Sequence, residues 1–172
     1  FDGLPTLEKH RGMSPFAAAL ELIADCCCDK VDGGDPGLSP HSLEQFSYYI
    51  NEEGILFHAI QNENCKTPLP DLFYEKHTNR MDAARDVIRS TEARLLNEET
   101  IEPAHTAERI AGSITLDNKE YGRYEGEMQI MKVDLPADPR VNVVGRVKQI
   151  DLELLAYCGA GRAFKVNWKE NE

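Results

Sequence analysis

Four arginines lie close together in the middle of the chain, at Arg80, Arg85, Arg89 and Arg94. A guanidinium group can donate two parallel hydrogen bonds to one phosphate or carboxylate, so such a run is typical of an anion-binding site. Arg85 and Arg89 are four residues apart, and this spacing places them on one face whether the segment is a strand or a helix.

Neutral hydrogen-bonding groups accompany the arginines in the run His77–Arg94, among them Asn79 and Ser90. We therefore predict that Asn79, Arg80, Arg85, Arg89 and Ser90 bind an anionic ligand. The alternative is a solvated strand whose arginines pair with carboxylates of the same run, since surface ion pairs are common and weakly informative.

A second polar group, which includes Glu8, His10 and Arg11, follows the expected short strand Leu4–Glu8. In α/β folds, ligands and catalytic groups gather where strands end, just before the next helix. Glu8 is a candidate acid or base, and its basic neighbours could shift its pKa or bind an anion. The alternative is a charged loop without a role in chemistry.

Two aspartates, Asp32 and Asp35, lie at the end of a further expected strand, Lys30–Gly33. Together with Glu8, Asp35 would supply the pair of carboxylates that glycoside cleavage usually needs. Aspartates beside glycines are also typical of turns, so a purely structural role is an equal alternative.

The run Asp117–Gly126 contains Tyr121 and Tyr124 after an Asp-Asn pair that favours a turn. Tyrosine rings and hydroxyls suit contacts with a sugar, and we predict such a contact for Tyr121. The alternative is a turn with packing tyrosines.

Composition excludes several functions. The 172-residue chain has a net charge of -11, which argues against nucleic-acid binding, and it lacks an apolar stretch long enough to cross a bilayer. Three of its five cysteines are consecutive, Cys26–Cys28, and no C-x-x-C motif is present. We expect buried, reduced thiols in a cytoplasmic protein, with no metal and no organic cofactor. The isolated residues His41, His58 and His105 are expected to be structural.

The first part of the chain is expected to alternate strands and helices. Ser14-Pro15 and Ser39-Pro40 each place an N-cap serine before a proline at the first helical position. Phe16, Leu20, Ile23 and Cys27 should face inward from the first helix, and Leu43, Phe46 and Ile50 from the second. The pattern predicts two βα units of a parallel sheet, and two strands cannot close one, so more units must precede Phe1 or come from another chain.

After a boundary expected at residues 52–56, short connections favour a small antiparallel β-barrel or sandwich. The expected strands, the first of them edge-like, are Gly54–Gln61, Asp86–Ser90, Ser113–Asp117, Glu127–Val133, Val141–Val147 and Arg162–Trp168. A helix is expected at Gln149–Tyr157, with Gly159 in the C-cap position.

Several stretches taken together resemble the MupG-type 6-phospho-N-acetylmuramidases, a bacterial glycosidase family. They run in order along the chain: Leu4–Arg11, Gly34–Pro36, His77–Arg80, Arg85–Arg94, Asp117–Tyr124 and Pro139–Arg146. The resemblance implies an α/β plus mainly β fold, in which residues 1–54 are the last βα units of a (β/α)8 barrel and residues 55–172 a cyclophilin-like β-barrel domain. The rest of the (β/α)8 barrel would be the missing partner.

The implied activity is hydrolysis of a 6-phosphorylated muramyl disaccharide during cell-wall recovery in the cytoplasm. Glu8 and Asp35 would line the mouth of the (β/α)8 barrel, while Arg85 and Arg89, with Arg80, would hold the 6-phosphate or the lactyl carboxylate. An incomplete barrel has no closed active site, so the chain alone is expected to be inert. The alternatives are a non-catalytic module that binds an anionic saccharide or a partner, and prolyl isomerisation, which fold likeness alone suggests.

Overall fold

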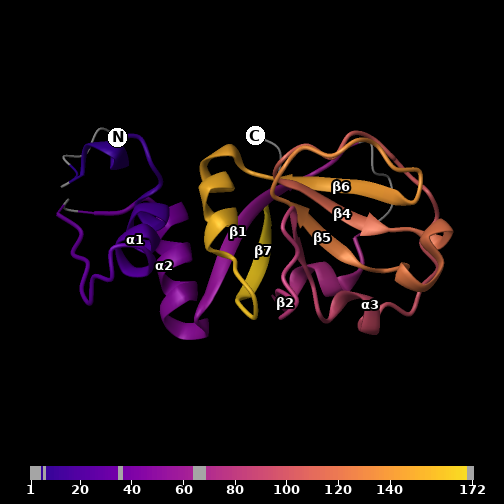
Figure 1. Cartoon of the computed structure of the whole chain (residues 1–172), viewed down its shortest axis with the longest axis horizontal. Coiled ribbons are helices and arrows are strands. Elements are labelled where there is room, and N and C mark those ends of the chain that lie inside the picture. Colours follow the sequence, from indigo (N-terminus) through magenta and orange to yellow (C-terminus); the bar gives the residue numbers. More distant parts are fainter. Residues whose placement is uncertain (1–4, 6, 35–36, 64–68, 170–172) are drawn as a thin grey trace.

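The structure is a computed structural model of the chain. It describes residues 5, 7–34, 37–63 and 69–169. Two α-helices, α1 and α2, lie at one end of the molecule, and a strongly curved sheet forms the rest (Figure 1). Among the described residues, no helix is long and apolar enough to span a bilayer.

The N-terminal segment holds the 3-10 helix η1 (Glu8–His10), α1 (Pro15–Ala24) and α2 (Pro40–Glu52). Both α-helices begin after an N-cap serine with proline as the next residue, as predicted. The side chain of Ser39 accepts a hydrogen bond from the Ser42 amide at 3.2 Å, whereas Ser14 makes no such bond.

The two strands predicted in this segment are wrong as far as the structure describes them. Lys30–Gly33 has no regular structure, and Glu8 begins η1 instead of ending a strand. Part of Leu4–Glu8 lies outside the described residues. A strand needs a partner for its backbone N–H and C=O groups, and no described part of this chain pairs with either segment.

The predicted inner faces of the helices are only partly right. Phe16 and Leu20 are buried, whereas Ile23 is half-exposed. Leu43 and Ile50 are 50% and 75% exposed. Phe16 packs edge-on against Phe46 at a centroid distance of 5.2 Å and against Tyr49 at 5.6 Å. The helices thus bury the face around Phe16 and leave the opposite side of α2 uncovered. Cys26 and Cys27 are exposed rather than buried, because α1 ends before them.

The rest of the chain forms one seven-stranded sheet with the order β2-β7-β1-β6-β4-β5-β3. All pairs are antiparallel except β1 with β7. The strands are β1 (Gly54–Gln61), β2 (Lys76–Thr78), β3 (Val87–Arg89), β4 (Ser113–Asp117), β5 (Met128–Met131), β6 (Val141–Val147) and β7 (Ala163–Lys169). The short helices are η2 (Asp71–Tyr74), α3 (Ala93–Leu96), η3 (Lys119–Tyr124) and η4 (Gln149–Tyr157).

The two outer strands of this sheet meet, so the sheet is a nearly closed barrel. Asn79 and Ser90 form an antiparallel bridge just beyond β2 and β3. On either side of this bridge, the Arg80 amide donates to the Arg89 carbonyl, and the Thr91 amide donates to the Thr78 carbonyl, both at 3.0 Å. We call this contact between the ends of β2 and β3 the seam.

Large apolar side chains of the strands are buried in the barrel. Phe57, Ile88, Ile114 and Phe164 are all essentially inaccessible to solvent. Strand residues of alternating orientation supply most of this core, as the period of two in a strand requires.

The predictions for this part are largely confirmed. The ranges of β1, β4, β6 and η4 are as predicted, although η4 is a 3-10 helix whose C-cap residue is Cys158 rather than Gly159. Strand β1 is central and buried rather than edge-like, since it pairs with both β6 and β7. Strand β2 was not predicted. The expected boundary at 52–56 coincides with the passage from α2 to β1, while the division into two domains stays a prediction.

Candidate functional site

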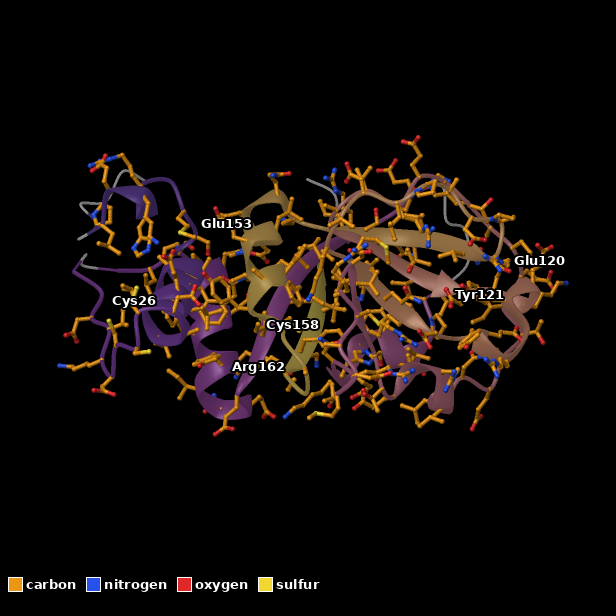
Figure 2. The ribbon with its side chains drawn as sticks, in the orientation of Figure 1. Cys26, Glu120, Tyr121, Glu153, Cys158 and Arg162 are labelled. Carbon is orange, nitrogen blue, oxygen red and sulfur yellow. The ribbon has the colours of Figure 1, made fainter. Side chains whose placement is uncertain are left out.

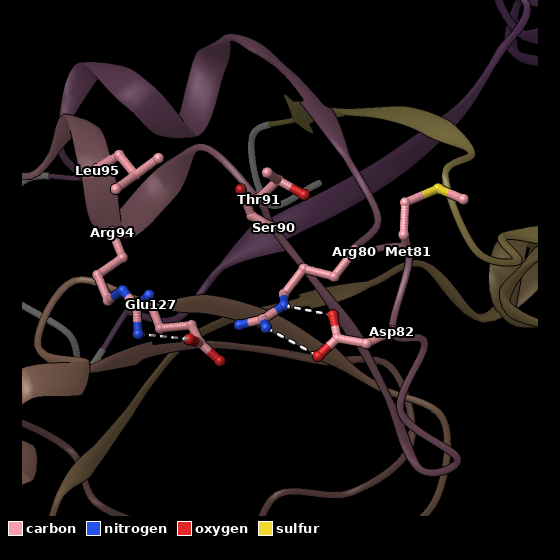
Figure 3. A pocket seen from close by; sticks show the side chains of 8 residues that line it. All are labelled: Arg80, Met81, Asp82, Ser90, Thr91, Arg94, Leu95 and Glu127. Carbon is pink, nitrogen blue, oxygen red and sulfur yellow. Dashed lines mark hydrogen bonds and ion pairs between the residues drawn. The ribbon is translucent and has the colours of Figure 1, made fainter.

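An open pocket of about 330 Å³ lies beside the seam. Residues that follow β2 and β3, the helix α3 and the residue before β5 line it (Figure 3). The lining residues are Arg80, Met81, Asp82, Ser90, Thr91, Arg94, Leu95 and Glu127. Closure of the barrel creates this pocket, because the seam brings the residues after β2 next to those after β3.

Glu127 is the most buried charged group in the pocket, with a side chain only 4% exposed. Arg89 Nε donates to its Oε1 at 2.9 Å, and Arg94 Nη1 lies 3.8 Å from its Oε2. The ion pair of Arg94 with Glu127 is therefore long, and the Arg94 side chain is 36% exposed. An incoming anion could bind Arg94 without breaking the shorter bond that holds Glu127.

Arg80 faces the same pocket from the other side (Figure 3). Its Nε and Nη2 atoms donate to the two carboxylate oxygens of Asp82, each at 2.8 Å. This hydrogen bond raises the pKa of Arg80 and lowers that of Asp82. Asp82 is largely exposed, so it can move aside and leave the Arg80 guanidinium group accessible to a ligand.

Asp117 lies behind Glu127, on the neighbouring strand β4. Its amide donates to the Glu127 carbonyl at 3.0 Å, and its side chain is buried. Burial, together with the nearby Glu127 charge, raises the pKa of Asp117 to about 8. The Asp117 carboxyl therefore holds its proton to a higher pH than an exposed aspartate does, which reduces the negative charge near Arg89.

Tyrosine rings flank the pocket. The Arg94 guanidinium lies 5.6 Å from the centroid of the Tyr124 ring, and the rings of Tyr121 and Tyr124 meet edge-on at 5.4 Å. The guanidinium of Arg140 lies over the Tyr121 ring, 4.4 Å from its centroid, and so covers one face of that ring. Figure 2 shows Tyr121 at the end of the barrel that is distant from the N-terminal helices. Tyr124 is thus better placed than the predicted Tyr121 to contact a ligand bound at Arg94.

Two predicted binding residues, Asn79 and Ser90, hold the seam together. The fully buried Asn79 side chain donates to the carbonyls of Cys158 and Gly159, and it accepts from the Arg89 amide. Ser90 Oγ contacts His77 Nδ1 at 2.9 Å and accepts from the amides of two following residues. Ser90 also borders the pocket, whereas Asn79 does not.

The predicted pair Arg85 and Arg89 does not form a joint site. Arg85 precedes β3, is 91% exposed and is held by both oxygens of the adjacent Asp86. Arg89 is mostly buried and bonded to Glu127. Two pocket residues, Leu95 and Glu127, lie outside the predicted run His77–Arg94. The run contains Met81, Asp82, Thr91 and Arg94, but these were not among the predicted binding residues. Their shared location depends on the seam, which the sequence pattern did not reveal.

The candidate residues of the N-terminal segment are distant from this pocket and do not converge. Glu8 is exposed and pairs through both oxygens with Arg11, which lowers the pKa of Glu8. His10 is buried, and its Nε2 lies 3.3 Å from Glu21, which also pairs with Lys9. Asp35 lies outside the described residues, so the catalytic role of Glu8 and Asp35 stays a prediction.

A further polar cluster joins α2 to the barrel. His41 and His58, expected to be isolated, both contact the buried carboxylate of Asp151, at 2.7 Å and 3.1 Å. Among the described residues, these three form the group of side chains able to hold a metal ion. They come from α2, β1 and η4, and this wide separation along the chain explains why spacing alone did not find them.

Comparisons with known proteins give the class of this molecule. Residues 1–48 match the N-terminal and residues 55–167 the C-terminal family model of 6-phospho-N-acetylmuramidases. The chain therefore belongs to the 6-phospho-N-acetylmuramidase family, as the resemblance predicted. No protein of curated function matches it.

Two solved structures are similar over nearly the whole chain. A conserved Enterococcus faecalis protein of unknown function shares 42% identity with a TM-score of 0.85, and the match covers 98% of this chain and 45% of that one. An uncharacterised B. cereus protein shares 29% identity with a TM-score of 0.78, over 96% of this chain and 48% of that one. The chain thus spans about half the length of both.

Proposed function

We propose that the chain is the substrate-positioning part of a hydrolase that cleaves 6-phospho-N-acetylmuramyl saccharides. The family match names the activity. The observation that carries the role of this chain is the pocket at the seam, where Arg80 and Arg94 face open space beside one buried carboxylate. A cytoplasmic location and a role in cell-wall recovery are further parts of the proposal.

The charges of the pocket suit such a ligand. Arg80 and Arg94 balance the charges of Asp82 and Glu127 in the pocket lining, and Arg89, which bonds Glu127 from outside the lining, adds a third positive charge. A 6-phosphate or a lactyl carboxylate would accept paired hydrogen bonds from these guanidinium groups, because such charge-assisted bidentate bonds are strong. Glu127 Oε2 and the hydroxyl of Thr91 would bond sugar hydroxyl or amide groups.

The cleaving groups belong to another part of the protein in this proposal. Residues 1–54 are the last units of a (β/α)8 barrel whose other strands lie in the remaining half of the longer relatives, and the seven-stranded barrel is cyclophilin-like. Two observations support this: the chain covers 45% and 48% of the two similar structures, and the Pro15–Ala24 and Pro40–Glu52 helices leave apolar side chains uncovered. Glu8 and Asp35 would then face the substrate only in the complete barrel.

Calorimetric titration of this chain with 6-phospho-N-acetylmuramic acid tests the site. Arg94→Ala is expected to weaken binding roughly tenfold or more, because a hydrogen bond to a charged group contributes about 1.5–3 kcal/mol. Arg85→Ala is the matched control, since Arg85 is exposed and outside the pocket. Loss of binding in the control but not in Arg94→Ala would favour the original Arg85–Arg89 prediction over the pocket.

The activity is tested separately. The longer protein should release products from a 6-phosphorylated muramyl disaccharide, while the 172-residue chain should release none. If the longer protein binds the sugar acid at Arg94 but cleaves no such disaccharide, the alternative role of a non-catalytic saccharide-binding module is correct.

A further inference from the structure

The polar cluster of His41, His58 and Asp151 has the composition of a transition-metal site. Its ligand atoms, one from each residue, all lie within 4.8 Å of one another. His58 and Asp151 are fully buried, and His41 is 24% exposed at the edge of the cluster. Two imidazoles and one carboxylate are donors that suit first-row transition metals such as zinc.

The two distances to Asp151 are close to those between ligands of one ion. His41 Nε2 is 2.7 Å from Asp151 Oδ1, and His58 Nδ1 is 3.1 Å from Asp151 Oδ2. Ligand atoms around a zinc ion, at bond lengths of about 2.0–2.1 Å, lie roughly 2.8–3.5 Å apart. The two rings face each other at a centroid distance of 3.8 Å, so both present nitrogen atoms to the same carboxylate.

Hydrogen bonds from neighbouring groups already orient these side chains. His58 Nε2 lies 2.9 Å from Glu44 Oε2, which places a carboxylate behind the ring nitrogen that does not face Asp151. A metal-ligating histidine almost always donates its second N–H to such a group. Asp151 is fixed in the same way, because the Gln45 side chain and the His58 amide donate to its two oxygens at 2.9 and 2.8 Å. These bonds leave the sides of the carboxylate that face the imidazoles available to an ion.

Charge gives a third reason. Asp151 and Glu44 place two carboxylates on either side of His58, a fully buried ring. A divalent cation bound to Asp151 and the imidazoles would supply positive charge near these carboxylates, and His58 Nε2 would stay directed at Glu44. Lys169 supports Glu44 from outside at 3.0 Å.

From this arrangement we infer that His41, His58 and Asp151 bind one divalent transition-metal ion, with Glu44 as the positioning residue behind His58. The ion would join α2, β1 and η4, which lie next to one another where the N-terminal helices meet the barrel (Figure 1). The partly exposed edge at His41 leaves room for a water ligand. This proposal departs from the expectation of no metal, which depended on the lack of a C-x-x-C motif.

Titration of the chelator-treated chain with Co²⁺ tests the site, because cobalt bound to imidazoles gives visible d–d absorption bands. One equivalent should produce the bands, and Zn²⁺ should displace it. His41→Ala should weaken Co²⁺ binding roughly 100-fold, because it removes a ligand. Glu44→Gln should weaken it roughly tenfold, because it changes only the group that orients His58. Both residues are partly exposed, so these variants should fold, and circular dichroism of the metal-free proteins checks this.

His105→Asn is the matched control. His105 has a left-handed backbone (φ 45°) that asparagine tolerates, and it is not part of the cluster. Its Co²⁺ affinity should equal that of the parent chain. Absence of the bands, or equal affinity in parent and His41→Ala, overturns the proposal and leaves a network of hydrogen bonds without an ion.

Discussion

The N-terminal segment and the barrel face the same requirement, since every strand needs a partner, but only the barrel meets it within the chain. In the barrel, β1 pairs with β6 on one side and β7 on the other, and the seam joins β2 to β3. In the N-terminal segment, the expected strand Lys30–Gly33 finds no partner among the described residues and stays irregular. The helices nevertheless form, because an α-helix satisfies its backbone within itself.

This difference also separates the two sets of candidate site residues. The arginines after β2 and β3 converge on one pocket, because ladder hydrogen bonds fix the backbone on both sides of it. Glu8 and Arg11, in contrast, form an exposed pair between neighbours along the chain. A polar cluster is therefore informative about function where strand pairing brings distant residues together, and less so where its members are only near in sequence.

The largest expected effect concerns the packing of the barrel. Gly145 in β6 lies under Trp168, and a Cβ atom there would come within 2.7 Å of the Ile60 carbonyl oxygen. The β1 backbone is held by its neighbouring strands and cannot move away from the added side chain. Gly145→Val should therefore lower the free energy of unfolding by about 3 kcal/mol. In the N-terminal segment, Gly33→Ala should change it by less than about 0.5 kcal/mol, since no described residue lies within 4 Å of the added Cβ. Urea denaturation measures both, and equal losses would contradict the contrast.

The next effect concerns the seam. Asn79→Ala removes the side chain that bonds the Arg89 amide and the carbonyls of Cys158 and Gly159. Leaving such buried groups unpaired should cost about 2 kcal/mol. Asn97→Ala is the control, because Asn97 makes one exposed hydrogen bond and should cost less than about 0.5 kcal/mol. If Asn79→Ala is as stable as this control, the seam does not hold the barrel closed.

The sequence predicted those elements whose pattern is local. The ranges of β4 and β6 follow from alternating apolar residues such as Ile114 and Leu116, which need no knowledge of the partner strand. The helices follow from Ser-Pro pairs at their first turns. These signals depend on residues that are neighbours in the sequence, so a single amino-acid sequence is enough to detect them.

The same reasoning could not place residues that meet only through the sheet. His41 and Asp151 are 110 residues apart, and they touch because α2 and η4 both pack against β1. Glu127 reaches the pocket through the β3–β5 and β4–β5 ladders. Strand β2 has only three residues, too few for a period-two pattern, so the seam and the pocket beside it were not predicted.

The last comparison concerns the dependence of stability on pH, which should differ in sign between the two regions. The pKa of the Asp117 carboxyl is raised to about 8, so the fold binds a proton that the unfolded chain releases above about pH 4. Stability supplied by this proton is complete below pH 4 and is lost as pH rises toward 8, at up to about 1.4 kcal/mol per pH unit. Asp117→Asn keeps the shape without titrating and should remove that decline.

Glu8 is the matched carboxyl in the N-terminal segment, and its pKa is lowered by Arg11. Its contribution is present above pH 4.5 and is lost as pH falls, which is the opposite direction. Because Glu8 is exposed to solvent, Glu8→Gln should leave the curve between pH 5 and 8 unchanged. Unfolding free energies measured across this range decide the question. A parent chain whose stability is flat from pH 5 to 8, and equal to that of Asp117→Asn, would mean that Asp117 is ionised next to Glu127. The pocket would then hold one more negative charge, and its affinity for anions would have to come from Arg80 and Arg94 against both carboxylates.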